Sequence, residues 1–103
     1  MVLFRRLLGE VLRSARMQRG MTLRELSAEA RVSLGYISEI ERGQKEASSE
    51  LLASLCQAMD LPLSEVLRDV ADAVAIEEIS IGIVASTQIT VARPTGNVVA
   101  SAA

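Results

Sequence analysis

The sequence has no histidine and no tryptophan, and it has one cysteine, one tyrosine and one phenylalanine among its 103 residues. Without histidine, the commonest general base and the commonest metal ligand are both missing, and no Ser-His or Cys-His pair exists. There is no glycine-rich phosphate-binding loop, and the carboxylates of Glu39 and Glu41 would point apart on a helix. The composition therefore argues against an enzyme, and it predicts neither a cofactor nor a metal site.

The single cysteine, Cys56, lies in an apolar helical pattern, which predicts a buried free thiol. One cysteine forms no disulfide within its own chain, as is usual in a reducing compartment. The first eight residues are too few and too soon charged for a signal peptide, and no apolar run approaches the roughly 18 residues of a membrane span. We therefore expect a soluble protein of the cytoplasm.

Charge is unevenly distributed along the chain, although the net charge is only −2. Residues 1–46 carry nine basic and six acidic side chains, a net charge of +3. Residues 47–103 carry two basic and seven acidic side chains, a net charge of −5. A basic segment in an otherwise acidic protein is typical of a surface that meets the phosphates of nucleic acid.

The centre of the sequence has the pattern of two short helices with a tight joint. Thr22 with Glu25 three residues later predicts a capping box, and Ser33 is a second N-cap. We expect helices over about 23–30 and 34–42. The apolar residues that would pack the joint are Leu26, Ala30, Val32, Ile37 and Ile40. Two helices joined by three or four residues form the architecture of a DNA-binding helix-turn-helix.

Three further helices are expected, one before this pair and two after it. Apolar residues at helical spacing predict the first over about 6–19. Ser48 or Ser49 would cap the fourth helix, and Ser64 would cap a fifth that begins at Glu65. Their apolar stripes comprise Leu8, Val11, Leu12, Ala15 and Met17, then Leu51, Leu52, Leu55, Cys56 and Met59, and then Val66, Leu67, Val70, Ala71 and Val74. The expected fold class is therefore all-α, with five helices.

The pattern changes after residue 75, which predicts a helical domain over 1–75 and a short C-terminal extension over 76–103. Alternating isoleucines within the extension favour a strand, and a helix that continues to about Ile79 is the alternative. Such an apolar segment needs cover, either from its own domain or, as we favour, from the second chain of a homodimer. Turn-forming and small residues from Arg93 onward predict a disordered end.

DNA recognition would fall to the start of the second motif helix, which enters the major groove in a helix-turn-helix. The candidates are Ser33, Leu34, Gly35, Tyr36, Ser38 and Glu39 for the groove, and Thr22, Arg24, Arg42 and Lys45 for the phosphates. Leu34 suits a thymine methyl, Tyr36 a phosphate or base edge, and Glu39 either a cytosine amino group or solvent. Gly35 either lets the backbone approach the groove or serves tight helix packing. For each basic residue the alternative is a solvated surface charge.

Arg16 and Glu41 lie beside the apolar stripes of the first and third helices. A partly buried ion pair between them would tie these two helices together, which is a structural role. Loss of one partner would leave an unpaired buried charge.

At these residues the sequence resembles a known family. The segments Gly20-Met-Thr-Leu-Arg-Glu-Leu-Ser27 and Val32-Ser-Leu-Gly-Tyr-Ile-Ser-Glu-Ile-Glu-Arg-Gly43 are similar to the Cro/C1-type (XRE) helix-turn-helix repressors and activators. The resemblance covers about residues 8–67. It implies a five-helix, lambda-repressor-like DNA-binding domain with its motif at 22–43 and its third helix in the groove. It also implies that the ion pair described above is a structural feature of the family.

Two residues depart from the family pattern. Leu23 stands where the family commonly has a glutamine that contacts phosphate, so the resemblance places a DNA contact at a position that here lacks the amide. Ala47 stands where the family often has a proline before the serine that opens the fourth helix. This loosens the preceding loop without changing the expected fold.

The longer stretch 32–52 looks like the actinobacterial regulators of Clp protease genes. A homodimer would place its two reader helices about one duplex turn apart on a pseudo-palindromic DNA operator, with RNA polymerase as a candidate further partner. The likeness itself implies an activator of Clp protease and other proteostasis genes in the stress response. Regulators of this type are themselves Clp substrates, and the end Val98–Ala103 is similar to the small apolar C-termini that such proteases take. A frayed end without function is the alternative for that segment.

The competing function belongs to another class, a protein-interaction module such as an antitoxin or anti-regulator with the same fold. Leu34, Gly35 and Glu39 fit such a surface, because they make the start of the second motif helix apolar or acidic. The surrounding arginines favour DNA instead.

Overall fold

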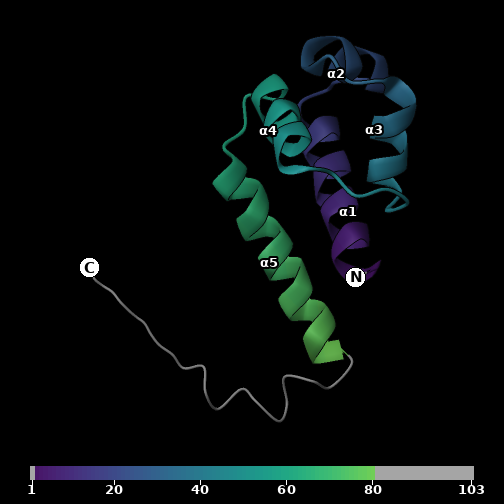
Figure 1. Ribbon diagram of the computed structural model, residues 1–103. Helices are drawn as coiled ribbons and strands as arrows, with labels where there is room; N and C mark the ends of the chain where they lie inside the picture. Colours follow the sequence, from purple (N-terminus) through teal and green to yellow (C-terminus); the bar gives the residue numbers. More distant parts are fainter. Residues whose placement is uncertain (1, 81–103) are drawn as a thin grey trace.

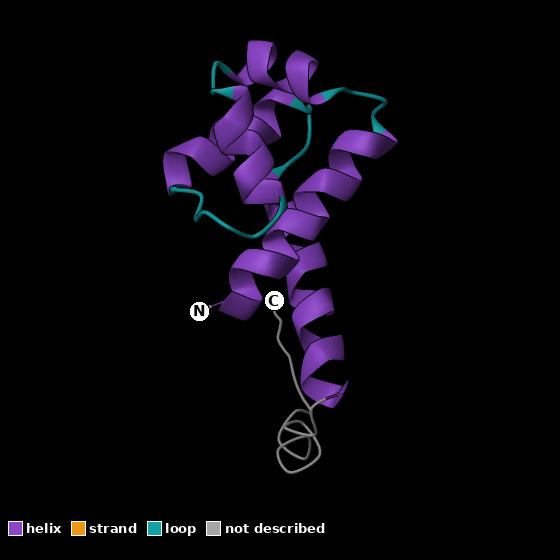
Figure 2. Cartoon of the chain, turned by 90° about the vertical axis from the view of Figure 1, so that its right-hand side faces the viewer, coloured by secondary structure: helices purple, strands orange, loops and turns teal. Residues whose placement is uncertain are grey.

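The computed structural model describes residues 2–80, which form five helices joined by short loops (Figures 1 and 2). The helices are α1 (Val2–Gln18), α2 (Leu23–Ala30), α3 (Leu34–Glu41), α4 (Ser49–Ala58) and α5 (Leu63–Ser80). Within this range there is no strand, and the predicted all-α class with five helices is confirmed. No helix of the described part is long and apolar enough to cross a membrane.

The helix α1 is the centre of the arrangement and lies between α3 and α5 (Figure 1). It packs against both of them, while α2 packs against α3 and α4, and α4 packs against α5. One aliphatic core joins all five helices, and it consists of Leu8, Leu12, Ala15, Leu26, Ile37, Ile40, Leu52, Leu55, Cys56, Met59, Val66 and Val70. Burial of one large aliphatic side chain of this kind contributes about 1.5–3 kcal/mol to the free energy of folding. The recognition helix expected from the sequence is thus fixed from behind by α1 and α2.

Three residues assigned to the apolar stripes do not belong to the core. Met17, Leu67 and Ala71 are exposed. A turn of α-helix holds 3.6 residues, so a residue one or two positions after a buried one lies 100° or 200° away around the helix. Leu67 and Ala71 each follow a buried valine, and Met17 stands two residues after the buried Ala15. The buried faces are therefore narrower than the sequence predicted.

Helix α1 begins earlier than predicted, at Val2 instead of about Arg6. The added turns are held by contacts from elsewhere in the chain. Arg5 lies 3.9 Å from the carboxylate of Glu46, and Arg6 lies 3.5 Å from that of Glu77. Leu7, which follows the added residues, is buried although it is not among the predicted stripe residues.

Helix α5 differs from the prediction at both ends. It begins at Leu63 without a Ser64 cap, because the carbonyl of Pro62 accepts hydrogen bonds from the amides of Glu65 and Val66 at 3.0 and 3.3 Å. It runs on to Ser80, so the helical alternative holds for Ile76–Ser80 and the strand expected there is wrong. The predicted domain boundary after residue 75 falls inside this helix. The strand pattern beyond it, the disordered end and the degradation-type terminus lie outside the described residues.

Two close approaches in the fold were not foreseen from the sequence. Gly9 is buried in α1, and a Cβ at this position would lie 2.3 Å from the carbonyl oxygen of Ile40. Only glycine allows α1 to pack this closely on the end of α3. The guanidinium of Arg19 donates hydrogen bonds to the carbonyls of Met59 and Asp60, which closes the C-terminal end of α4.

Candidate nucleic-acid interface

Local hydrogen bonds set the two motif helices and the joint between them. The Thr22 hydroxyl accepts from the amide of Glu25 at 3.0 Å, and the Glu25 carboxylate accepts from the amide of Thr22 at 2.9 Å, which completes the predicted capping box. The Ser33 hydroxyl accepts from the amide of Tyr36 at 3.1 Å, as expected for the cap of α3. Between these caps Arg31 takes a left-handed conformation, with φ of 59°, and ends α2.

Ser27 strengthens the joint in a way that the sequence analysis did not anticipate. Its hydroxyl donates to the carbonyl of Val32 at 2.6 Å, and its own carbonyl accepts from the amides of Arg31 and Val32 at 2.9 and 3.2 Å. A serine inside a helix is a weak signal by itself, since its side chain has many possible partners. Here it fixes the angle at which α3 leaves α2.

The start of α3 is the exposed part of the motif. Ser33, Leu34 and Gly35 are exposed, and the side chains of Ser38 and Glu39 are half-buried. A Cβ placed on Gly35 would have no atom within 4 Å. Tight helix packing therefore does not explain this glycine, and the open space in front of it leaves room for another molecule. An apolar residue and a bare backbone here form a surface suited to the floor of a groove.

The arginines and the cap residue predicted to contact phosphate are accessible to another molecule. Thr22, Arg24 and Arg42 are exposed, and the Arg42 guanidinium donates to the Ser38 hydroxyl at 2.5 Å. Arg42 is the residue that closes α3, whose last helical residue is Glu41. Leu23 is half-buried against the core, and its aliphatic side chain has no polar group for a phosphate.

Tyr36 lies differently from its neighbours on α3. Its ring packs partly against the core, and its hydroxyl donates a hydrogen bond to the backbone carbonyl of Glu46 at 3.1 Å. The ammonium of Lys45 lies 6.0 Å from the centre of the same ring, at the limit of a cation–π contact. The structure thus joins Tyr36 to the loop after α3, which the sequence analysis missed. A contact between a side chain and a backbone carbonyl ten residues later leaves no pattern in the sequence.

The ion pair predicted between Arg16 and Glu41 is present behind this surface. Nε of Arg16 lies 2.7 Å from Oε2 of Glu41, and Nη2 lies 3.0 Å from Oε1. Only 11% of the Arg16 side chain and 5% of the Glu41 side chain are exposed. The hydrogen bond to the carboxylate raises the pKa of Arg16, an effect that burial partly offsets. The Arg16 guanidinium therefore stays charged at neutral pH.

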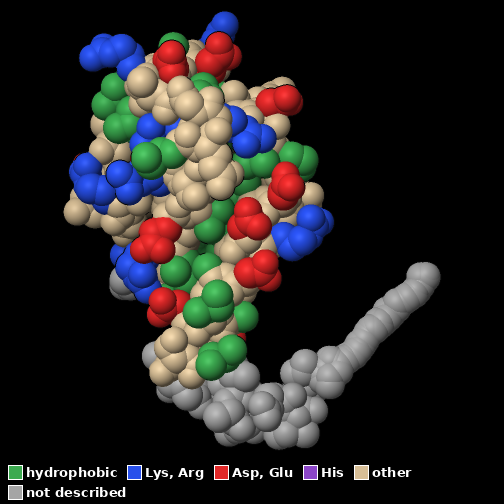
Figure 3. All heavy atoms as spheres, turned by 180° about the vertical axis from the view of Figure 1, so that it is seen from behind, with side chains coloured by type: hydrophobic (Ala, Val, Ile, Leu, Met, Phe, Trp, Pro, Cys, Tyr) green, Lys and Arg blue, Asp and Glu red, His purple; other side chains and the backbone are tan. Residues whose placement is uncertain are grey.

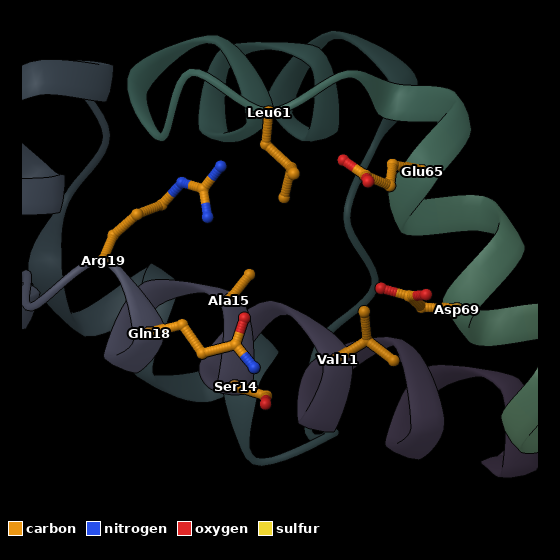
Figure 4. A pocket seen from close by; sticks show the side chains of 8 residues that line it. All are labelled: Val11, Ser14, Ala15, Gln18, Arg19, Leu61, Glu65 and Asp69. Atoms are coloured by element: carbon orange, nitrogen blue, oxygen red, sulfur yellow. The ribbon is translucent and has the colours of Figure 1, made fainter.

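A cavity of about 390 Å³ lies on the other side of α1, between α1 and α5 (Figure 4). Arg19 and Glu65 point into it from opposite sides, and Leu61 points into it from the connection between α4 and α5. No residue of α2 or α3 lines this cavity. It is therefore separate from the exposed start of α3.

The geometry described above is that of a helix-turn-helix whose recognition helix is held from behind and exposed in front. Residues 12–66 match the family model for this motif, described as Helix-turn-helix. The chain belongs to this family of DNA-binding regulators, in its Cro/C1-type (XRE) branch.

Known proteins place the chain more narrowly within the family. It is 60% identical over 76 residues to the transcriptional regulator ClgR of Mycobacterium tuberculosis, a match that spans 74% of this chain and 68% of the relative. Among solved structures it is similar to the clp gene regulator ClgR of Corynebacterium glutamicum, with 42% identity and a TM-score of 0.72 over 87% of this chain and 96% of that one. It also resembles the restriction-modification controller protein C.AhdI of Aeromonas hydrophila, with 26% identity and a TM-score of 0.58 over 59% and 92% of the two chains.

Proposed function

We propose that this chain is a sequence-specific regulator of transcription that binds the DNA of Clp protease genes. One observation carries the proposal, namely the 60% identity over 76 residues to a protein named as the transcriptional regulator ClgR. The structural relative from Corynebacterium glutamicum is described as a clp gene regulator. Both descriptions favour a DNA-binding regulator over a protein-interaction module with the same fold.

In this proposal α3 enters the major groove with its exposed first turn. The groove residues are Ser33, Leu34, Gly35, Ser38 and Glu39, and the phosphate contacts come from Thr22, Arg24, Arg42 and Lys45. Leu34 would meet a thymine methyl, and Glu39 would accept from a cytosine amino group. The surface has few of the long amides that pair with adenine, so methyl contacts and DNA shape carry much of the specificity.

The regulator would act as a homodimer on a pseudo-palindromic operator. Helix α5 supports this, because Ile76 and Ile79 are large apolar residues that lie close together on its exposed side. The space-filling view shows apolar side chains gathered near the C-terminal end of α5 (Figure 3). A second copy would cover them and place two recognition helices about 34 Å apart, one turn of the duplex.

We also propose that the regulator activates its target genes through contact with RNA polymerase, and that a Clp protease degrades it. The polymerase contact and the degradation rest on the sequence resemblance alone. A C-terminal degradation signal would lie at residues 98–103, outside the described part of the chain.

DNA binding is tested by titrating the purified chain on duplexes from upstream of the clp genes of its own genome, at four salt concentrations, beside scrambled duplexes of equal length. We expect tighter binding to at least one upstream duplex, and affinity that falls steeply as salt rises, since each phosphate contact releases counterions. Equal affinity for all duplexes, or binding that is insensitive to salt, would overturn the proposal. An Arg24→Gln variant should lower the affinity for both kinds of duplex to a similar degree.

A further inference from the structure

The loop between α3 and α4, residues 43–47, is held to the rest of the domain from two sides. This loop follows the recognition helix directly and carries Lys45, the only lysine of the chain. It contains Gly43 and lacks the proline that would stiffen its end, since Ala47 stands before the Ser48 cap of α4. The backbone of such a loop has many accessible conformations, so contacts from outside must define its path.

One of these contacts comes from α3. The Tyr36 hydroxyl donates to the carbonyl of Glu46 at 3.1 Å, and the Lys45 ammonium lies 6.0 Å from the centre of the Tyr36 ring. The same aromatic side chain thus forms a hydrogen bond with the backbone of the loop and lies near the cation that the loop carries. Lys45 itself is exposed, and no carboxylate within the described residues pairs with it.

The second contact comes from the first turns of α1. Gly43 approaches α1 so closely that a Cβ on it would lie 2.9 Å from Cα of Arg6. Arg5 lies 3.9 Å from the carboxylate of Glu46, and a hollow of about 280 Å³ lies between this part of α1 and the loop. The two contacts differ in origin: α1 meets the loop at Gly43 and Glu46, whereas Tyr36 meets it from α3, the helix whose start is exposed.

We propose that Tyr36 is a positioning residue, which holds the α3–α4 loop so that Lys45 meets a DNA phosphate, and that it is not a residue that distinguishes bases. This inference rests on the DNA-binding function proposed above. The hydroxyl proton of Tyr36 is already used by the loop carbonyl, so donation to a base acceptor would require that bond to break. A lysine on an untethered loop would lose more conformational freedom on binding, which weakens its contact with phosphate.

The test uses the full chain and four proteins: wild type, Tyr36→Phe, Lys45→Ala and the double variant. Each is titrated on the upstream duplex that the wild type binds most tightly and on a scrambled duplex of equal length, over a range of salt. Removal of the hydroxyl should weaken binding to both duplexes by the same factor, about three- to tenfold. The double variant should bind no more weakly than Lys45→Ala alone, because Tyr36 acts through Lys45.

Salt dependence separates positioning from a merely structural role. Loss of one phosphate contact lowers the slope of log affinity against log salt by about 0.9. Tyr36→Phe should lower the slope in the same direction as Lys45→Ala, while Lys45→Arg, which keeps the charge, should retain the wild-type slope. The melting temperature of Tyr36→Phe should match that of the wild type.

Three outcomes would overturn the inference. A loss confined to the upstream duplex would make Tyr36 a base contact, and losses that add in the double variant would make the two residues independent. An unchanged salt slope in Tyr36→Phe, with or without a lower melting temperature, would leave the hydroxyl with a structural role only. Failure of the wild type to bind DNA in a salt-dependent manner would instead refute the proposed function, so the two failures are distinguishable.

Discussion

Arg16 and Glu41 form a bidentate ion pair that joins α1 to α3, with Nε to Oε2 at 2.7 Å and Nη2 to Oε1 at 3.0 Å. The remaining terminal nitrogen of Arg16 donates to the carbonyl of Met21 at 2.8 Å, in the turn before α2. One guanidinium therefore ties the central helix to α3 and to the turn that leads into α2. Because the fork of arginine is planar, these three bonds also fix the angle between the elements.

Breaking this pair from one side should be far more costly than replacing it. Glu41→Ala leaves the Arg16 guanidinium buried without its carboxylate, and we expect the free energy of unfolding to fall by about 3–5 kcal/mol. Urea denaturation followed by circular dichroism measures the change. The double variant Arg16→Met/Glu41→Leu serves as the control, since apolar residues of similar volume should recover most of the loss. A single variant that loses less than about 1 kcal/mol would show that the pair does not hold the fold.

Gly9 should be intolerant of even one added methyl group. Gly9→Ala would place a Cβ 2.3 Å from the carbonyl oxygen of Ile40 and 2.7 Å from that of Glu41, so α1 must move away from α3. We expect a loss of about 1–3 kcal/mol in the free energy of unfolding, although alanine is the better helix former. The matched control is Ser14→Ala, an exposed position on the same helix. Thermal unfolding of the two variants beside the wild type tests this, and a Gly9→Ala protein as stable as its control would contradict the packing.

The motif was predictable from the sequence because its determinants are local. The capping box of Thr22 and Glu25 and the cap at Ser33 act within three residues, and the buried positions of α2 and α3 follow helical spacing. Arg16 and Glu41 were placed together by their positions beside two apolar stripes, and the pair is present. The exposed start of α3 follows from the same pattern, although its contacts with DNA stay a prediction.

The parts that failed depend on contacts between distant residues. The β-branched residues at the end of α5 favoured a strand, but Glu77 pairs with Arg6 and Val74 packs against the core, and these contacts support a helix. The close approach of Gly9 to α3 and the bond between Tyr36 and Glu46 likewise join residues that no sequence pattern relates. Tertiary packing thus determined the secondary structure and the contacts of these residues, because their local propensity was weak or misleading.

Cys56 should make stability depend on pH only under alkaline conditions. The thiol is buried, and burial raises its pKa, because the apolar core disfavours the thiolate. The folded protein therefore holds this proton more tightly than the unfolded chain does. Its contribution to stability is fully present below the unfolded pKa of about 8.5 and is lost as pH rises through the folded pKa.

Between pH 8 and pH 10, we expect the free energy of unfolding to fall more for the wild type than for Cys56→Ala, and the difference should equal the contribution of the protonated thiol. Below pH 7.5 the free energies of unfolding of the two proteins should change with pH in parallel. Urea denaturation at each pH measures the difference. Native protein should also resist a thiol reagent that modifies the urea-unfolded chain at once. Rapid modification of the native protein would contradict the burial of this side chain.

The exposed apolar side of α5 should form the dimer contact. Replacing both Ile76 and Ile79 with glutamate should shift the protein to monomer, with the dissociation constant raised at least ~100-fold. Sedimentation at several concentrations measures the state, and Met17→Glu, an exposed apolar residue of α1, is the control. A chain ended after Ser80 separates the contribution of α5 from that of residues 81–103. If the double glutamate variant stays dimeric while the truncated chain is monomeric, the dimer contact lies in residues 81–103 and not in α5.

Gly35 should show opposite effects on folding and on DNA binding. Nothing lies within 4 Å of the position of a Cβ on this residue, and alanine is favoured over glycine in a helix by about 1 kcal/mol. Gly35→Ala should therefore raise the melting temperature. If the backbone of α3 approaches the floor of the major groove here, the same methyl group would meet the bases and lower the affinity for the upstream duplex. Thermal unfolding and DNA titration of one protein preparation measure both effects. A variant that is more stable and binds DNA as tightly as the wild type would show that this turn of α3 stays clear of the groove floor.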